Sequence, residues 1–269
     1  MDESEIITLI EKYRSLQLSK IIDFDKFNHY ALTHHSTSIE GSTLTETETR
    51  LLLDEGLTPK GKPIIESLMV IDHFDALQFI IESAREKKKI TPEFIQQINA
   101  KVLRQTGSLF QTVFGELDSS KGVFRKGNVS AGSSYFVNYD KIELLLNKLC
   151  EEIQKKVSRE ETIVEKLNSS FDAHFDLVTI HPFYDGNGRT SRLLMNYLQL
   201  ILNLPMAIVF KEDKVAYFDA LIETRKKEKM EIFRKFMYNQ YGKYLLEEVN
   251  KAEDLNNSTS SGKGFSFVF

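Results

Sequence analysis

Hydrophobic residues recur along most of the chain at the three- and four-residue spacing of amphipathic helices, and the alternating pattern of strands is almost absent. Glycine (13) and proline (5), which interrupt helices, are scarce among the 269 residues. The spacing predicts helices over residues 4–18, 64–87, 91–105, 138–156, 160–179, 189–203, 212–226 and 229–249. We therefore expect an all-α fold.

Local signals mark where helices begin and where the helical pattern fails. A capping box at residues 45–48 starts a short helix that ends at Gly56. Residues 107–137 are rich in glycine and serine and lack the helical period, and the only strand candidate within them is a small hairpin over residues 123–129. The polar residues 250–262 predict a disordered tail.

Composition and charge exclude several classes of function. Thirty-five Lys and Arg residues against 39 Asp and Glu give a net charge of −4, whereas nucleic-acid-binding domains usually carry a basic face. The single cysteine, Cys150, excludes a disulfide framework, and His34 and His35 are expected to be exposed helix residues rather than metal ligands. No apolar run reaches the roughly 20 residues that span a bilayer, and the acidic start is unlike a secretory signal. We expect a cytoplasmic protein without nucleic-acid or membrane partners.

The signature loop, residues 181–192, stands between two predicted helices and contains the clearest chemical signal of the chain. Gly186, Asn187 and Gly188 open the second helix, whose first amides lack intrahelical partners. Such amides, together with the positive end of the helix dipole, form a nest for an anion. On its own this tripeptide is more often a turn, and the loop lacks the spacing of a Walker A or calcium-binding motif.

Four further side chains of the signature loop suit phosphate chemistry. Arg189 and Arg192 stand at i and i+3, and their guanidinium groups match phosphate oxygens. Asp185 is a carboxylate of the type that holds Mg²⁺ against phosphates, and His181 can act as a base near neutral pH. A phosphate nest, a metal ligand, two arginines and a base together predict phosphoryl or nucleotidyl transfer.

These twelve residues resemble, without a mismatch, the signature of the Fic family, His-x-Phe-x-Asp/Glu-Gly-Asn-Gly-Arg-x-x-Arg. Residues 122–132 resemble the flap hairpin of that family, and residues 217–221 resemble the helix that lines its base pocket. The similarity covers roughly residues 91–240. It implies the Fic-fold helical bundle with a small β-hairpin flap.

The resemblance also implies a division of the chain. Residues 1–60 would form an N-terminal helical extension, residues 61–250 the Fic catalytic core with its flap at about 122–137, and residues 251–269 a flexible tail. A homodimer is compatible with the resemblance.

Fic proteins typically transfer AMP from ATP to a Ser, Thr or Tyr hydroxyl of a target protein, with Mg²⁺, or Mn²⁺ in its place. The resemblance implies that this chain is a protein adenylyltransferase that modifies a protein target or itself. The implied roles are His181 as the base, Asp185 as the Mg²⁺ ligand, Gly186, Asn187, Gly188, Arg189 and Arg192 as phosphate ligands, Tyr217 and Leu221 in the base pocket, and Phe124, Arg125 and Val129 in the target-docking flap.

A second motif lies ahead of the catalytic region. Ser36-x-x-x-Glu40-Gly41 resembles the inhibitory motif of the family, although as a local pattern it also fits a plain helix end. Ser36 and Glu40 stand at i and i+4 and share one helix face. A bidentate ion pair of Glu40 with Arg192 would occupy the arginine meant for the γ-phosphate, which predicts an autoinhibited enzyme.

The sequence leaves other functions open. The same scaffold supports phosphorylation, phosphocholination or removal of AMP, and a nucleotide-binding regulatory module is the non-enzymatic alternative.

Two places depart from the family pattern: residues 133–136 replace the prolines of the flap, and Arg225 replaces an asparagine near the adenine.

Overall fold

The computed structural model describes residues 1–16, 24–112, 115–131, 134–159 and 161–260. Its main helices are α1 (Glu3–Ser15), α2 (Phe24–Ile39), α3 (Glu46–Glu55), α4 (Ile64–Arg85), α5 (Pro92–Val102), α6 (Ile142–Val157), α7 (Ile163–Ile180), α8 (Asn187–Ile201), α9 (Lys214–Lys227) and α10 (Met230–Ser260). Between α5 and α6 lie the short strands β1 (Leu109–Thr112), β2 (Gly115–Asp118), β3 (Ser130–Ala131) and β4 (Ser134–Tyr135). The predicted all-α fold class is confirmed, and no helix of the described residues is long and apolar enough to cross a membrane.

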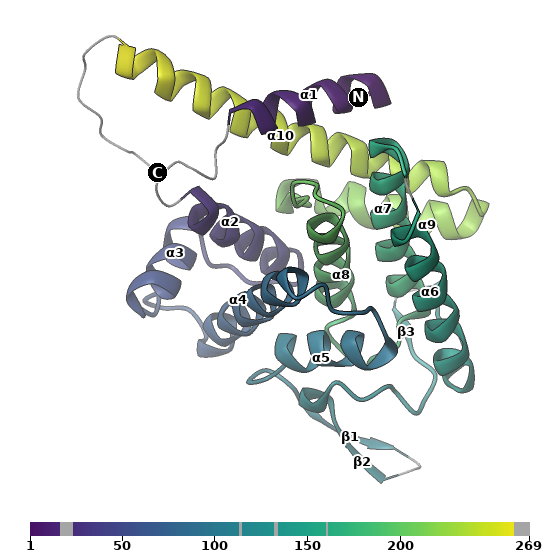
Figure 1. The fold of residues 1–269 in the computed structure, drawn as a ribbon. Helices are drawn as coiled ribbons and strands as arrows, with labels where there is room; N and C mark the ends of the chain where they lie inside the picture. Colours follow the sequence, from purple (N-terminus) through teal and green to yellow (C-terminus); the bar gives the residue numbers. More distant parts are fainter. Residues whose placement is uncertain (17–23, 113–114, 132–133, 160, 261–269) are drawn as a thin grey trace.

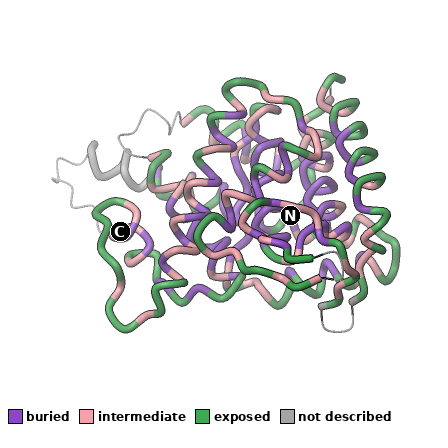
Figure 2. The backbone as a smooth tube through the Cα atoms, turned by 90° about the horizontal axis from the view of Figure 1, so that it is seen from below, coloured by how far each residue is buried: buried purple, intermediate pink, exposed green. Residues whose placement is uncertain are grey.

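Helix α8 is the centre of the bundle, with α4, α5 and α7 packed around it (Figure 1). Almost every side chain of α8 is buried, and Leu194 and Met195 expose no surface. Figure 2 shows this interior enclosed by the exposed outer turns of the surrounding helices. Because burial of apolar surface is the main driving force of folding, the signature loop leads into the most firmly held element.

The N-terminal helices pack onto this bundle at two places. Helix α1 runs along α10, far away in the sequence, while α2 lies against α3 and α4 and reaches α8 (Figure 1). This packing buries His34 and His35, which are 2% and 9% exposed, so the prediction that they are exposed is wrong. The same packing places the C-terminal end of α2 beside the start of α8.

Local signals set the helix ends as expected. Thr45 and Glu48 form the predicted capping box at α3, and Gly56 ends that helix with a left-handed φ of 72°. The Thr91 hydroxyl accepts a hydrogen bond from Phe94 N at the start of α5. These signals act within three or four residues, so they are readable without the tertiary structure.

The predicted flap over residues 122–137 contains a hairpin, β3–β4, but its strands lie after residues 123–129, the range in which the sequence placed them. Antiparallel pairing occurs instead between β1 and β2 and between β3 and β4, on either side of that segment. Residues 123–129 are irregular because their backbone is tied to the signature loop: Arg125 N donates to Pro182 O at 2.9 Å. Strand pairing and this tertiary hydrogen bond compete for the same backbone groups.

The flexible tail predicted over residues 251–269 is also wrong for residues 251–260, which continue α10. The side chain of Ala252 is buried, and Glu253 forms an ion pair with Lys12 of α1 at 2.8 Å. Packing against α1 therefore extends the helix beyond the point where its own composition favours order. The predicted tail residues 261–269 lie outside the described part of the chain.

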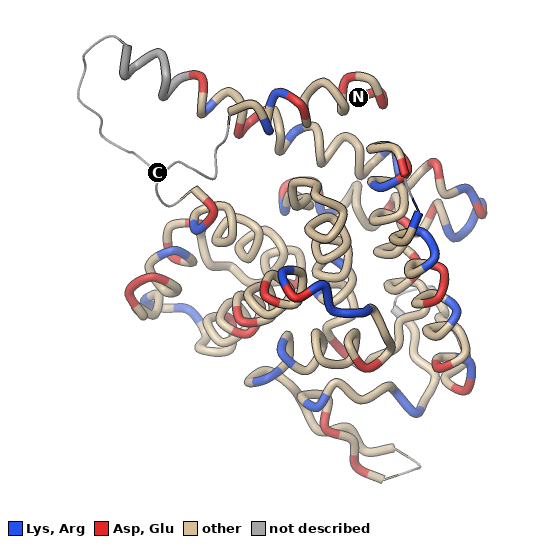
Figure 3. The backbone as a smooth tube through the Cα atoms, viewed as in Figure 1, with Lys and Arg blue, Asp and Glu red and all other residues tan. Residues whose placement is uncertain are grey.

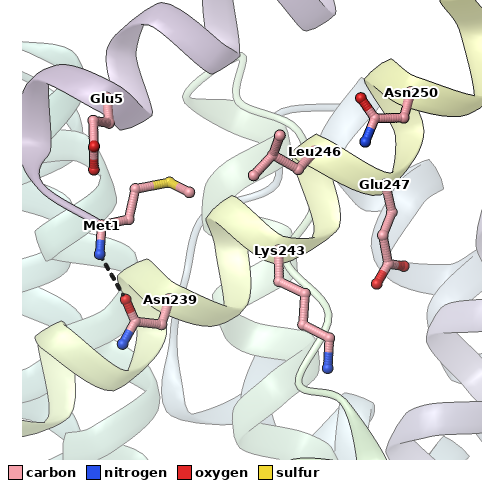
Figure 4. Close-up of a pocket in the computed structure, with 7 residues that line it drawn as sticks. All are labelled: Met1, Glu5, Asn239, Lys243, Leu246, Glu247 and Asn250. Carbon is pink, nitrogen blue, oxygen red and sulfur yellow. Dashed lines mark hydrogen bonds between the residues drawn. The ribbon is translucent and has the colours of Figure 1, made fainter.

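Charged side chains lie mainly on the outer faces of the helices. Figure 3 shows acidic and basic residues interspersed along α3 and α6. A cavity of about 580 Å³ opens between α1 and α10, where the Met1 amine donates to Asn239 Oδ1 at 2.9 Å (Figure 4). Its lining contains none of the predicted site residues.

Candidate active site

The signature loop begins with a strained residue. His181 caps the C-terminus of α7 in the left-handed region, with φ 52° and ψ 59°, and its N–H donates to Leu177 O at 3.0 Å. A non-glycine residue in this region costs on the order of 1–3 kcal/mol, so surrounding contacts must hold it there. The conformation turns the chain sharply between α7 and α8 and leaves the imidazole half-buried.

Two asparagine side chains hold the loop in shape. Asn187 accepts from Phe183 N at 3.0 Å and donates to Phe183 O at 2.9 Å. Asn99 of α5 donates to Asp185 O and to Thr190 Oγ1, both at 3.1 Å. The sequence placed Asn187 at the phosphates, and the structure places its amide on the loop backbone. Asn99 was missed because only the packing of α5 on α8 reveals its role.

Glycine is required at Gly188 because the site is crowded there. A Cβ atom added to Gly188 would lie 2.5 Å from Glu40 Oε1 and 3.2 Å from Arg192 Nη1. Glu40 therefore reaches the first turn of α8, where helix amides favour an anion. The glutamate carboxylate is the anion that lies at this helix end.

Arg192 is the most heavily engaged side chain of the site and is only 3% exposed. Its Nη2 donates to Glu40 Oε1 at 2.7 Å and to Ser36 O at 3.0 Å, and its Nε donates to Ser36 Oγ at 2.9 Å. The contact with Glu40 uses one carboxylate oxygen, so the bidentate geometry expected from the sequence is wrong. Ser36 accepts from Nε and Nη2, and Nη1 donates to the Tyr217 hydroxyl.

The charge of Glu40 is stabilised by its neighbours. Burial opposes ionisation, but the guanidinium groups of Arg192 and Arg189 outweigh burial and hold the pKa of the Glu40 carboxyl below its usual value. Glu40 is therefore an anion at neutral pH. Gly41 follows it with φ 112°, a backbone conformation that favours glycine and ends the α2 segment.

The carboxylate of Asp185 remains available for a cation, because its contact with Arg189 is long. Arg189 is buried, and its Nη2 lies 3.4 Å from Asp185 Oδ1, a long contact. The Asp185 side chain is 56% exposed. Among the described residues, no group of three or more His, Cys, Asp or Glu side chains could hold a metal. The single exposed carboxylate fits a Mg²⁺ ion whose other ligands come from phosphate and water.

The residues predicted for the base pocket are buried side chains of α9. Tyr217 and Leu221 are buried, 1% and 2% exposed. The Tyr217 hydroxyl lies 3.4 Å from Arg192 Nη1 and 3.0 Å from Nε2 of His174. His174 is a buried core residue, as its apolar face predicted, but its hydrogen bond to Tyr217 could not be read from helical periodicity.

The three predicted flap residues lie in different environments. Arg125 is 2% exposed and donates to His181 O at 2.8 Å, to Gly127 O at 2.6 Å and to Val137 O. Its donors join the flap to the signature loop, and a place for Arg125 in a target-docking flap remains a prediction. Phe124 packs against Phe183, with ring centroids 5.5 Å apart. Val129 is half-buried and remains a predicted docking residue.

His181 is a neutral imidazole in this environment. Burial lowers the pKa of His181 to about 4, and the nearby Arg125 and Arg225 guanidinium groups act in the same direction. The Nδ1 atom lies 3.3 Å from Val178 O. We assign the ring proton to Nδ1 from this contact, which leaves Nε2 as a lone-pair acceptor at neutral pH.

Comparison with known proteins agrees with this geometry. The Fic/DOC family matches residues 89–199, from the start of α5 to the end of α8. "Protein adenylyltransferase Fic" of Drosophila virilis is 30% identical over 227 residues, which are 82% of this chain and 44% of that protein. The chain therefore spans less than half the length of this relative.

Solved structures share the fold. A Fic-domain-containing signaling protein of Bacteroides thetaiotaomicron is similar with a TM-score of 0.80 at 22% identity, covering 93% of this chain and 97% of that one. IbpAFic2 in complex with adenylylated Cdc42 is similar with a TM-score of 0.54 at 19% identity, covering 90% and 69%. The signature loop, its position before the central helix and the match of the family model together show a Fic/DOC domain over residues 89–199.

Proposed function

We propose that this chain is an autoinhibited protein adenylyltransferase. It transfers AMP from ATP to a Ser, Thr or Tyr hydroxyl of a protein target, or of the chain itself, and releases pyrophosphate. The observation that carries the proposal is the ion pair of Glu40 with Arg192 inside an otherwise complete signature loop. The adenylyltransferase name of the Drosophila virilis relative and the adenylylated Cdc42 bound to IbpAFic2 support the reaction and the class of target.

The chemistry requires one proton transfer and one displacement. Nε2 of neutral His181 accepts the proton of the target hydroxyl, and the oxygen attacks the α-phosphorus of ATP. The bond from that phosphorus to the bridging oxygen breaks, and the electron pair leaves with pyrophosphate. General base catalysis of this kind contributes roughly 10²–10⁴-fold in rate.

The remaining residues hold the triphosphate. The amides of the first turn of α8, with Gly188 leaving room for close approach, bind phosphate oxygens. Arg189 and Arg192 neutralise the outer phosphates. Asp185 would hold Mg²⁺, which supplies charge neutralisation on the phosphates when it is bound. Tyr217 orients Arg192 from below.

Glu40 inhibits by occupying the phosphate position. Its carboxylate takes a donor of Arg192 and lies over Gly188, where a phosphate would meet both charge repulsion and steric conflict. A displaced γ-phosphate leaves the α-phosphorus out of line with the attacking oxygen. A misplacement of about 1 Å can cost about 10²-fold in rate.

The test is label transfer by the purified full chain with Mg²⁺, using ATP labelled at either the α- or the γ-phosphate. We expect Glu40→Gly to transfer the α-label about 10²-fold faster than wild type, to itself or to proteins of a lysate. His181→Ala in the same background should abolish transfer, since it removes the base.

Other outcomes would replace the proposal. Equal labelling by wild type and Glu40→Gly contradicts autoinhibition. Label from the γ-phosphate identifies a kinase. Absence of both labels, with ATP binding retained in calorimetry, identifies a nucleotide-binding module or an enzyme with a different donor, such as a CDP-linked one. Loss of AMP from a modified protein, dependent on Glu40, identifies de-AMPylation.

A further inference from the structure

The flap places an aromatic ring directly on the imidazole of His181. The ring centroids of Phe136 and His181 are 3.8 Å apart, and the two planes are inclined by only 12°. Phe136 follows β4 and is half-buried. Its ring also lies 5.8 Å from the guanidinium carbon of Arg225, which comes from α9. Three distant segments of the chain therefore meet at the candidate base.

Backbone contacts fix this arrangement independently of the stacked rings. One guanidinium group, that of Arg125, donates both to His181 O and to Val137 O. Val137 is the next residue after Phe136, so the same side chain holds the flap backbone and the His181 backbone at a set separation. The hydrogen bonds of Arg125 therefore hold the two backbone segments that carry the stacked rings, so the stack does not depend on the Phe136 side chain alone.

The stacked geometry leaves the reactive atom open. An imidazole transfers protons through lone pairs in the plane of its ring, whereas Phe136 covers a face of the ring. Nδ1 is occupied at Val178 O, so one in-plane position, Nε2, remains for a substrate hydroxyl. A flat aromatic contact restricts rotation of the imidazole without blocking this position, and it keeps water from one face.

We propose that Phe136 is a positioning residue for His181: its stacked ring orients Nε2 toward the target hydroxyl and shields the imidazole from water. The catalytic part of this assignment rests on the proposed function. Its structural part, control of the His181 environment, does not depend on any reaction.

Removal of the ring should change how His181 binds protons. The charged groups that face His181 are Arg125 of the flap, Arg225 of α9 and Glu40 after α2. Burial is the largest cause of the low pKa of His181, and Phe136 supplies part of that burial. Without the ring, water reaches the imidazole and the pKa of His181 should rise toward its ordinary value of about 6.5.

The first experiment is an NMR titration of the His181 side chain in the full chain. We expect Phe136→Leu to raise the titration midpoint by at least one unit, a tenfold change in proton affinity, and Phe136→Tyr, which keeps the stack, to titrate as wild type does. Tyr135→Leu is the matched control, because Tyr135 is the adjacent aromatic residue and is 88% exposed. A Phe136→Leu protein that titrates as wild type does would overturn the proposal.

The second experiment measures self-labelling in the Glu40→Gly background. Phe136→Leu should lower the maximal rate by about 10–100-fold and leave the ATP concentration for half-maximal rate unchanged, because the ring contacts the base and not the phosphates. Phe136→Tyr should restore the rate. A rate for Phe136→Tyr as low as for Phe136→Leu, or a change confined to ATP affinity, contradicts a positioning role.

The two measurements separate failure of this inference from failure of the proposed function. If the Glu40→Gly protein transfers no AMP, the proposed function fails, and the NMR titration still decides whether Phe136 controls His181. If transfer occurs but Phe136→Leu alters neither the midpoint nor the rate, only the positioning role fails.

Discussion

Ser36 joins the proposed inhibitory segment to Arg192. Both its hydroxyl and its carbonyl accept hydrogen bonds from Arg192, whereas Glu40 contributes a single oxygen. Hydrogen bonds to a charged group contribute about 1.5–3 kcal/mol each. The hydroxyl of Ser36 should therefore contribute measurably to inhibition beyond the glutamate.

We predict that Ser36→Ala increases self-labelling by roughly tenfold, the equivalent of about 1.4 kcal/mol, and less than Glu40→Gly does. Loss of the hydroxyl leaves Arg192 Nε without its partner and weakens the hold on the arginine. Ser38→Ala, on the same helix, is the control. The prediction is wrong if Ser36→Ala and Ser38→Ala label at the same rate.

At the scale of elements, the flap and the signature loop behave as one unit. Arg125 donates to carbonyl groups of both, and Arg125 N also donates to Pro182 O. Carbonyl groups left unpaired in a buried place cost about 1–3 kcal/mol each. The Arg125 side chain is therefore a main contact that holds the flap against the signature loop, beside the backbone hydrogen bond to Pro182 O.

We predict that Arg125→Met lowers the free energy of unfolding by about 2–3 kcal/mol, because the buried carbonyl groups lose their donors. Amide hydrogen exchange should rise across residues 123–137 and at the signature loop together. Lys126→Met, at the exposed neighbouring position, should change neither quantity. Faster exchange in the flap alone would show that the two elements are independent.

At the scale of the whole molecule, burial of histidine makes stability depend on pH. Burial is the first cause that lowers the pKa of all six histidines, to about 4 for His34, His35 and His181 and to about 3 for His174. Below about pH 6.5 the histidines of the unfolded chain bind protons, whereas those of the folded chain stay neutral. The free energy of unfolding therefore decreases as pH falls toward 4. The pKa of Asp176, raised by burial to about 6, acts in the opposite direction as a single group.

We predict that the free energy of unfolding, measured by urea denaturation, falls by more than about 2 kcal/mol between pH 7 and pH 5. His73→Met should reduce the loss, because His73 is 1% exposed and its ring nitrogens have no hydrogen-bond partner among the described residues. Equal stability at the two pH values would contradict this account.

How much of the structure could be predicted from the sequence depends on how far apart in the chain the interacting residues lie. Capping at Thr45 and Thr91, the glycine at Gly56 and the clustered groups of the signature loop act over a few residues, so they were readable directly. The hydrogen bonds of Arg125 could not be predicted, because its carbonyl partners are 56 and 12 residues away in sequence. His34 and His35 were misread because α2 has neighbours on several sides.

The helical class, most helix ends and the reactive side chains of the site could be predicted from the sequence, because each depends on local spacing and residue type. How these side chains contact one another depends on the tertiary structure. Glu40 meets Arg192 across 152 residues, Phe136 stacks on His181 from the flap, and α10 extends past residue 250 along α1. Such contacts depend on the packing of whole helices, which determines which side chains meet and which of them keep access to a substrate.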